Sequence, residues 1–272
     1  MSLEEIQQLL LVHNLSPNKL LGQNFFVEPA FYPKLADYAE LGSDDVILDA
    51  GAGFGFLARF LAEMCKGVVA VEKDFQLAEL LRSRVKDLGN VSVVAGDVLK
   101  TQLPLFNKVI ALPPYYLSTQ LVVWVLERQV ECAILVVQRE FAQRLTAEVG
   151  TEDYSWLTVI AAQQAKEELL DLLPKDYFYP PPEVDSAILR IKPWRQKPFQ
   201  PKNFTLFVQL TKWLFTERNR KLAKAAAPFL RSHLRMSKPE AENAAVKLPF
   251  HDRRPRELEP EDFGAIADAL AN

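Results

Sequence analysis

The chain has 272 residues, enough for one large domain and a smaller one, and 49% of them are hydrophobic, enough to bury a core. No apolar run reaches the roughly 18 residues that a membrane span requires, which argues against a membrane protein. The formal net charge of −3 argues, taken alone, against a nucleic-acid partner.

Cysteine and histidine are rare in this chain. Cys65 and Cys132 lie in apolar surroundings, which indicates buried free thiols in a reducing compartment. Residues 1–5 are acidic and lack the basic region of a signal peptide, so we expect a cytoplasmic protein. No metal site is predicted, because the histidines lack metal-ligand spacing: they are His13, His233 and His251.

The N-terminal region is predicted to hold two helices joined by a loop. Residues 3–12 carry apolar side chains on one helical stripe, and a second helix is predicted over 29–40. The segment 16–26 is rich in proline, glycine and amides and predicts a loop. Its Gln23 and Asn24 offer paired donors and acceptors that suit a zwitterionic ligand.

A strand, a glycine turn and a helix follow. Residues 46–49 predict a buried strand and 56–64 predict a helix. The turn between them alternates three glycines: Gly51, Gly53 and Gly55. Glycine lets the backbone approach a ligand closely, and the helix start offers free N–H groups. This unit cradles nucleotides in doubly wound parallel sheets, although three glycines alone also fit an ordinary tight turn.

Acids or prolines follow the later strands. Apolar runs predict three of them, at 68–71, 91–95 and 109–111. Because the carboxyl ends of parallel strands line the ligand crevice, we expect Asp49, Glu72 and Asp97 to converge there. Glu72 lies 17 residues after Gly55 and suits a ribose diol, and Asp97 suits an adenine amine. The alternative is three solvated strand-end acids.

The remaining pattern predicts further elements and a second domain. Helices are predicted where apolar residues recur every three to four positions, at 76–88, 117–128, 140–148, 204–215 and 218–230. Strands are predicted at 132–138 and 186–191. A linker at 193–201 divides the chain into two predicted domains, 1–193 and 194–272.

A proline-rich segment precedes the last predicted strand. Pro180, Pro181 and Pro182 fix an extended loop. Such a stiff loop can hold the Phe178 ring as a stacking surface for a base. The alternative places Phe178 in the core, with the prolines capping the strand.

Positive charge is concentrated in the second predicted domain. Between Ile191 and Arg254 there are fifteen Lys and Arg and four acidic residues. Such a block on an acidic body indicates a phosphate-backbone partner, and the alternative is a solvated helical face. The residues predicted to contact that partner from one helix are Arg218, Arg220, Lys221 and Lys224.

The glycine turn, the strand-end acids and the run Pro113-Pro114-Tyr115 together resemble the S-adenosylmethionine-dependent methyltransferases. A dinucleotide-binding enzyme fits less well, because the third glycine of its motif falls two residues later than Gly55 and its motif includes no Pro-Pro-Tyr. Pro17-x-Lys19, followed by Gly-Gln-Asn-Phe at 22–25, resembles the KsgA family of ribosomal RNA adenine dimethyltransferases and the related Erm enzymes. The resemblance continues through 177–186, 214–222 and 253–263 and covers nearly the whole chain.

The resemblance implies an α/β fold, with a Rossmann-like seven-stranded sheet, mostly parallel with an antiparallel edge, and a small C-terminal helical domain. It implies S-adenosylmethionine as methyl donor and two adjacent adenines near the 3′ end of small-subunit ribosomal RNA as target, in a pre-30S particle bound by a monomer. The implied donor-binding residues are Gln23, Asn24, Phe26, Gly51, Gly53, Glu72, Asp97 and Leu112, and Asn24 and Phe26 belong to a lid. The implied catalytic residues are Leu112, Pro113, Pro114, Tyr115 and Phe178.

The motif at 112–115 departs from the family. KsgA-type enzymes carry Asn-Leu/Ile-Pro-Tyr, whose Asn side chain and a backbone carbonyl accept the hydrogens of the adenine amine while the aromatic ring stacks on the base. Leu112 stands at the Asn position, and a leucine accepts no hydrogen bond. Losing such an acceptor costs about 3 kcal/mol, roughly a hundredfold in rate.

Three interpretations of this departure stay open. The enzyme is active but slower, or the chain is an rRNA-binding assembly factor with little catalysis. In the third, a nearby acceptor takes over, from among Tyr116, Ser118 and Gln138. The presence of Asp49, Glu72 and Asp97 favours activity, because a protein that did not bind the methyl donor would not need these acids.

Overall fold

The computed structural model describes residues 3–128 and 130–271, so Met1 and Ser2 of the N-terminal segment lie outside the described residues. The chain forms two compact units. The first comprises Met1–Ala142 and Glu168–Pro193, and the second comprises Gln143–Glu167 and Trp194–Asn272. The second unit thus includes Gln143–Glu167, which the sequence analysis assigned to the first domain.

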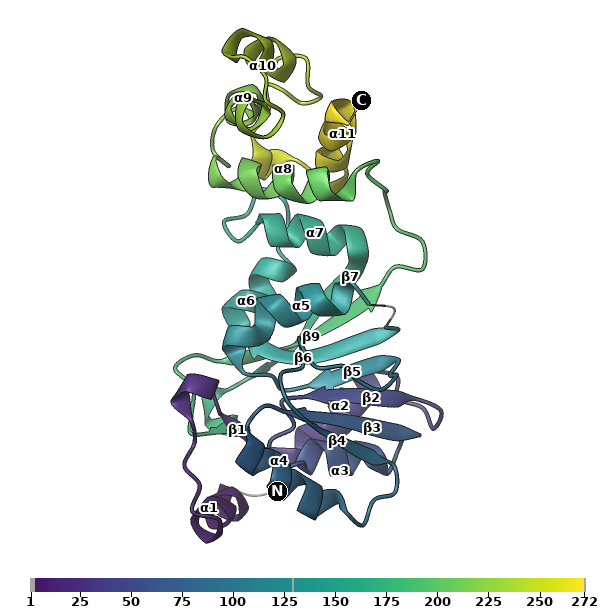
Figure 1. Cartoon of the computed structure of the whole chain (residues 1–272). Helices are drawn as coiled ribbons and strands as arrows, with labels where there is room; N and C mark the ends of the chain where they lie inside the picture. The colour runs from purple at the N-terminus through teal and green to yellow at the C-terminus, as the bar shows by residue number, and fades with distance from the viewer. Residues whose placement is uncertain (1–2, 129, 272) are drawn as a thin grey trace. The chain divides into compact units, whose positions relative to one another are not determined.

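The described residues of the sheet form seven strands in the order β4-β3-β2-β5-β6-β9-β7 (Figure 1). The neighbouring strands from β4 through β3, β2 and β5 to β6 are parallel to one another, and β9 pairs antiparallel with β6. The predicted Rossmann-like sheet is therefore confirmed. The strands are β2 (Val46–Ala50), β3 (Gly67–Glu72), β4 (Val91–Ala95), β5 (Lys108–Ala111), β6 (Cys132–Gln138), β7 (Ala165–Leu173) and β9 (Ser186–Pro193).

Strand β7 was not predicted from the sequence. Its residues Ala-Lys-Glu-Glu-Leu-Leu-Asp-Leu-Leu mix charged and apolar side chains without regular alternation, and most of them are only half-buried. A strand at the edge of a sheet gives a weak period-two pattern, because neither of its faces is fully covered.

Helices surround the sheet of the first unit. The cluster that contains α2, α3 and α4 side chains also contains residues of β2, β3, β5 and β6, so these helices cover the sheet with apolar side chains. The helices are α1 (Leu3–Val12), α2 (Tyr32–Tyr38), α3 (Phe56–Ala62), α4 (Phe75–Val85), α5 (Ser118–Leu126) and α6 (Arg139–Leu145). Short 3₁₀ turns lie at η1 (Lys19–Leu21), η2 (Pro29–Phe31), η3 (Tyr115–Leu117) and η4 (Lys175–Tyr177).

The turn after β2 requires its glycines. Gly51, Gly53 and Gly55 have φ of +84°, +55° and +79°, where L side chains are strained. A Cβ on Gly55 would overlap Leu81 of α4, and a Cβ on Gly51 would lie 3.2 Å from Pro114 Cδ. The glycines therefore allow the turn to pack against both α4 and the loop after β5.

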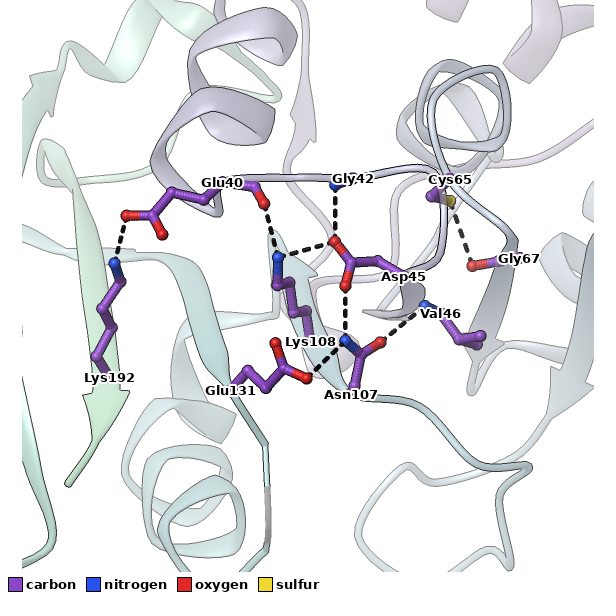
Figure 2. A network of polar contacts seen from close by, with 10 residues as sticks. All are labelled: Glu40, Gly42, Asp45, Val46, Cys65, Gly67, Asn107, Lys108, Glu131 and Lys192. Carbon is purple, nitrogen blue, oxygen red and sulfur yellow. Dashed lines mark hydrogen bonds and ion pairs between the residues drawn. The ribbon is translucent and has the colours of Figure 1, made fainter. Parts of the chain in front are cut away.

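A polar network lies where β2 and β5 begin (Figure 2). The Lys108 ammonium donates to Asp45 Oδ2 at 2.8 Å and to the Glu40 carbonyl at 2.7 Å, and its side chain is only 9% exposed. Asn107 donates to the other Asp45 oxygen and accepts from the Val46 N–H. The network fixes the starts of two adjacent strands in one register.

The second unit is helical. Its core includes Phe207, Phe229 and Phe263, each fully buried. The buried Tyr154 hydroxyl donates to the Leu258 carbonyl at 2.8 Å, which joins distant segments of this unit. The helices are α7 (Trp156–Gln164), α8 (Phe204–Thr216), α9 (Leu222–His233), α10 (Lys238–Ala245) and α11 (Pro260–Leu270), with a 3₁₀ turn η5 (Pro255–Glu257).

The predicted helix 218–230 is wrong at its beginning. Helix α9 starts at Leu222, and the residues before it form a turn in which the Arg220 N–H donates to the Glu217 carbonyl. The Arg218 guanidinium donates at 2.9–3.0 Å to the carbonyls of three residues in the loop before α7, Thr151, Glu152 and Tyr154. This tertiary clamp overrides the helical pattern of the sequence.

Candidate active site

A cavity in the first unit lies at the carboxyl ends of the parallel strands. Gly51 follows β2, Glu72 ends β3, Asp97 follows β4 and Leu112 follows β5, and all four line the cavity. This arrangement follows from the parallel sheet, because every β-to-helix connection leaves the same edge. A smaller cavity beside it is also lined by Gly51 and Leu112.

Glu72 is held firmly in the cavity wall. One carboxylate oxygen accepts from the Gly53 N–H and the other from the Asp74 N–H, both at 2.8 Å, and the residue is 7% exposed. Burial raises the pKa of Glu72, and these N–H groups partly oppose that shift. Each oxygen keeps a further lone pair, so the pair can accept from two hydroxyls of a ligand.

Asp49 lies deeper than the other two acids and lines the smaller cavity. It is 1% exposed, and its Oδ2 has no hydrogen-bond partner among the described residues. Burial, together with the charge of Glu72, raises the pKa of Asp49 to about 8. At neutral pH Asp49 is therefore mostly protonated, whereas the sequence suggested only a strand-end carboxylate.

Asp97 faces a lysine that the sequence analysis missed. Its Oδ2 lies 3.2 Å from Lys73 Nζ, and its Oδ1 accepts from the Leu99 N–H at 3.0 Å. Burial opposes ionisation of Asp97, but these bonds prevail and lower its pKa. Asp97 is thus a carboxylate. Lys73 also lines the cavity. Its side chain is half exposed, and the sequence pattern did not distinguish it from other surface lysines.

The loop after β5 brings Leu112, Pro113, Pro114 and Tyr115 to the cavity. The Tyr115 hydroxyl lies 2.5 Å from the hydroxyl of Ser186, which is fully buried at the start of β9. That contact fixes the direction of the Tyr115 ring. Leu112 contributes an apolar wall to both cavities, and it packs against the core.

Phe178 and Phe26 occupy different places. They lie on the paired strands β8 (Phe178–Tyr179) and β1 (Phe25–Phe26), with ring centroids 5.2 Å apart. Each is 5% exposed. Phe178 belongs to the core and also lines the main cavity, and its stacking on a base stays a prediction. Phe26 lines only the smaller cavity among those two.

The main cavity includes Tyr116, which the sequence analysis named as a substitute acceptor, and further residues that it did not single out. Tyr116 is 52% exposed, and a Cβ on Gly22 would lie 3.4 Å from its ring, so the two residues pack at the cavity wall. Besides Lys73, the lining residues that the sequence analysis missed are Leu21, Phe25, Val71, Leu77, Gly96, Val98, Leu117 and Val136. Most of them are apolar, and an isolated apolar position cannot be recognised as part of a cavity before the loops are folded.

Among residues 3–128 and 130–271, no group of three or more His, Cys, Asp or Glu side chains has the arrangement of a metal site. Within the same part of the chain, no helix is long and apolar enough to span a membrane.

Comparison with known proteins decides the family. The profile described as ribosomal RNA adenine dimethylase matches residues 14–248. A Methanosarcina barkeri protein named probable ribosomal RNA small subunit methyltransferase A is 33% identical over 267 residues, 97% of this chain and 91% of its own. A Thermococcus kodakarensis protein of the same name is 34% identical over 270 residues, 98% and 95% of the two chains. The chain belongs to the ribosomal RNA adenine dimethylase family.

Solved structures agree with this assignment. The 23S rRNA methyltransferase ErmE is 27% identical, with a TM-score of 0.68 over 92% of this chain and all of that one. A dimethyladenosine transferase from Plasmodium falciparum has the same fold, with a TM-score of 0.77 at 24% identity over 89% of this chain and 95% of its own. The predicted family and enzyme class, an rRNA-modifying methyltransferase, are confirmed.

In this family member, the basic residues selected from the sequence have different surroundings. The Arg218 guanidinium donates hydrogen bonds to three backbone carbonyls, and Arg220 forms an ion pair with Glu217 at 3.3 Å. Lys221 precedes α9, and Lys224 lies in its first turn; both are exposed. The four residues do not share a helix face, because three of them precede the helix.

Proposed function

We propose that the chain transfers methyl groups from S-adenosylmethionine to the exocyclic amines of two adjacent adenines near the 3′ end of small-subunit ribosomal RNA, within a pre-30S particle. The observation that carries the proposal is Glu72, fixed by two backbone N–H groups in a cavity of this family's fold. The proposal includes a role in small-subunit biogenesis and a monomeric, cytoplasmic protein.

The residues present fit the methyl donor. Glu72 would accept from the ribose hydroxyls, Asp97 from the adenine amine, and the glycine turn leaves room that a Cβ would fill. Asn24 lines both cavities and would meet the amino-acid tail. The bound donor would supply an electrophilic methyl group on its sulfonium.

The chain's own residues would hold the target base and its amine. Tyr115, fixed by Ser186, and Phe178 would present rings to the base. The Pro113 carbonyl would accept one hydrogen of the amine, and Leu112 accepts none. Of the three substitute acceptors considered, Tyr116 lines the cavity, whereas Ser118 and Gln138 are not among the described residues that do.

A second candidate function follows from Leu112 alone. A chain that binds ribosomal RNA and donor but transfers methyl groups poorly would act as an assembly factor. The two functions separate in one experiment, in which labelled S-adenosylmethionine is incubated with the protein and undermethylated pre-30S particles. We expect label at the adenines. Binding of the particles without any label, at protein in excess, would favour the assembly factor.

Glu72→Ala should weaken binding of S-adenosylmethionine by about 1.5–3 kcal/mol, the contribution of hydrogen bonds to a charged group. Titration calorimetry measures the change. Because Glu72 also orders Gly53 and Asp74, a denaturation curve must show that the variant folds. Glu79→Ala, on the exposed face of α4, is the control. Unchanged affinity in folded Glu72→Ala would remove Glu72 from the donor site.

Exposed cations around α9 should supply part of the RNA affinity. A groove there is lined by Lys224 and Arg231, with Ala227 and Pro228 between them. Replacing Lys221, Lys224 and Arg231 with Gln should reduce the slope of log affinity against log salt by up to about 0.9 for each lost phosphate contact. Arg218→Gln, which breaks the internal clamp, should lower stability and leave the slope nearly unchanged. An unchanged slope in the triple variant would make this surface a solvated face.

A further inference from the structure

The loop 18–24 forms one wall of the main cavity, through Leu21, Gly22, Gln23 and Asn24. Its backbone is organised internally. The Asn18 side chain accepts from the Leu20 and Leu21 N–H groups, and the Gly22 N–H donates to the Lys19 carbonyl. The loop is therefore ordered by its own hydrogen bonds, and its position depends on what fastens it to the rest of the unit.

The Gln23 carboxamide makes that attachment, and both of its polar groups are used. Its Nε2 donates to Asp74 Oδ2 at 3.1 Å, and its Oε1 accepts from the Asn18 N–H at 2.8 Å. A carboxylate can only accept and an N–H can only donate, so the two partners fix the orientation of the amide.

Asp74 continues the connection to the cavity acid. Its other oxygen accepts from the Gln76 and Leu77 N–H groups and caps α4. Its own N–H donates to Glu72 Oε1 at 2.8 Å. Hydrogen bonds thus run without interruption from Asn18 through Gln23 and Asp74 to Glu72.

We propose that Gln23 is a positioning residue that fastens the loop 18–24 to Asp74, and through it to Glu72, instead of contacting the amino-acid tail of the methyl donor. The inference rests on the proposed function only for the identity of the ligand. It differs from the sequence expectation, in which Gln23 offers its amide to a zwitterion, because the oxygen and the nitrogen of that amide each already bond a protein group, and only one N–H and one lone pair remain.

The polarity of the contact gives a rescue experiment. Gln23→Glu places two carboxylates together. In Asp74→Asn the amide oxygen keeps the cap of α4, so the new N–H₂ group faces the N–H₂ group of Gln23. Each single variant loses the contact. The double variant Gln23→Glu/Asp74→Asn restores it, because the new carboxylate at position 23 accepts from both the new amide and the Asn18 N–H. Gln76→Glu adds the same charge nearby on an exposed residue and is the control.

Two ligands separate positioning from tail contact. We expect each single variant to bind S-adenosylmethionine and 5′-methylthioadenosine, which lacks the amino-acid tail, about tenfold more weakly, and the double variant to recover most of both affinities. Weaker binding of S-adenosylmethionine that the double variant does not recover, with unchanged binding of 5′-methylthioadenosine, would overturn the proposal, since Gln23 itself would then contact the tail. Failure of the double variant to recover either affinity would overturn it as well.

Hydrogen exchange tests the loop without any ligand. The amides of Leu20, Leu21 and Gly22 should exchange faster in both single variants and at the original rate in the double variant. Unchanged exchange in the single variants would overturn the proposal. If the unaltered protein binds neither ligand while this exchange pattern holds, the proposed function fails and the attachment by Gln23 stands.

Discussion

Leu112→Asn is expected to raise the single-turnover rate of methyl transfer to pre-30S particles about a hundredfold. The side chain at this position lines the cavity beside Pro113, and it contributes only an apolar wall. An amide oxygen there would accept a hydrogen of the adenine amine as positive charge develops on its nitrogen. Donor affinity should stay nearly constant, because the new interaction strengthens mainly in the transition state.

The control for this variant is Leu112→Met, which keeps an apolar side chain of similar volume and should give no increase. If Leu112→Asn is no faster, another group already accepts the hydrogen. Tyr116, a half-exposed lining residue that carries a hydroxyl, is then the first to test, and Tyr116→Phe should slow the reaction. If no form transfers label, the assembly-factor function replaces catalysis.

Lys108→Met is expected to lower the free energy of unfolding by about 3–5 kcal/mol, since removing one partner of a buried ion pair strands the other. Asp45 is 8% exposed and would keep only the bonds from Asn107 and the Gly42 N–H (Figure 2). Urea denaturation followed by circular dichroism measures the change. A loss below 1 kcal/mol would mean that water or Asn107 solvates Asp45 adequately.

Lys192→Met is the matched control for that measurement. Its ammonium pairs with Glu40, whose side chain is 68% exposed, so the loss should be under about 1 kcal/mol. Both pairs should depend on pH in the same direction, because the hydrogen bond from Lys192 also lowers the pKa of Glu40. Burial opposes ionisation of Asp45, but the bonds from Lys108, Asn107 and Gly42 prevail and lower its pKa. This contribution is therefore present above the unfolded-state pKa and is lost as the pH falls through the folded-state pKa.

The sequence predicted the cavity well where strand ends decide positions. Glu72 and Asp97 follow short apolar runs, and a parallel sheet must bring the ends of such runs to one edge. The glycine turn was recognisable for the same local reason, because three positive φ values need residues without a Cβ.

Prediction failed where a side chain's partner is distant in the sequence. Arg218 appeared to belong to a basic helix, but its guanidinium binds a loop 64–67 residues away. The resemblance implies that Phe26 touches the methyl donor; the structure places its ring against Phe178 beside the smaller cavity, and its contact with the donor stays a prediction. Composition shows that such groups can make polar or aromatic contacts, but only the folded chain selects the partner.

The protonated carboxyl of Asp49 makes folding of the first unit a proton-uptake reaction near neutral pH. Its pKa is about 8 in the folded chain, against an ordinary value of 3.8, so the unfolded chain releases the proton throughout this interval. Through this group, stability falls as the pH rises from about 4 to about 8. Asp45, just before β2, acts in the opposite sense and at lower pH, because its pKa is lowered in the folded chain. The two buried acids therefore give this strand opposite pH dependences in adjoining pH ranges.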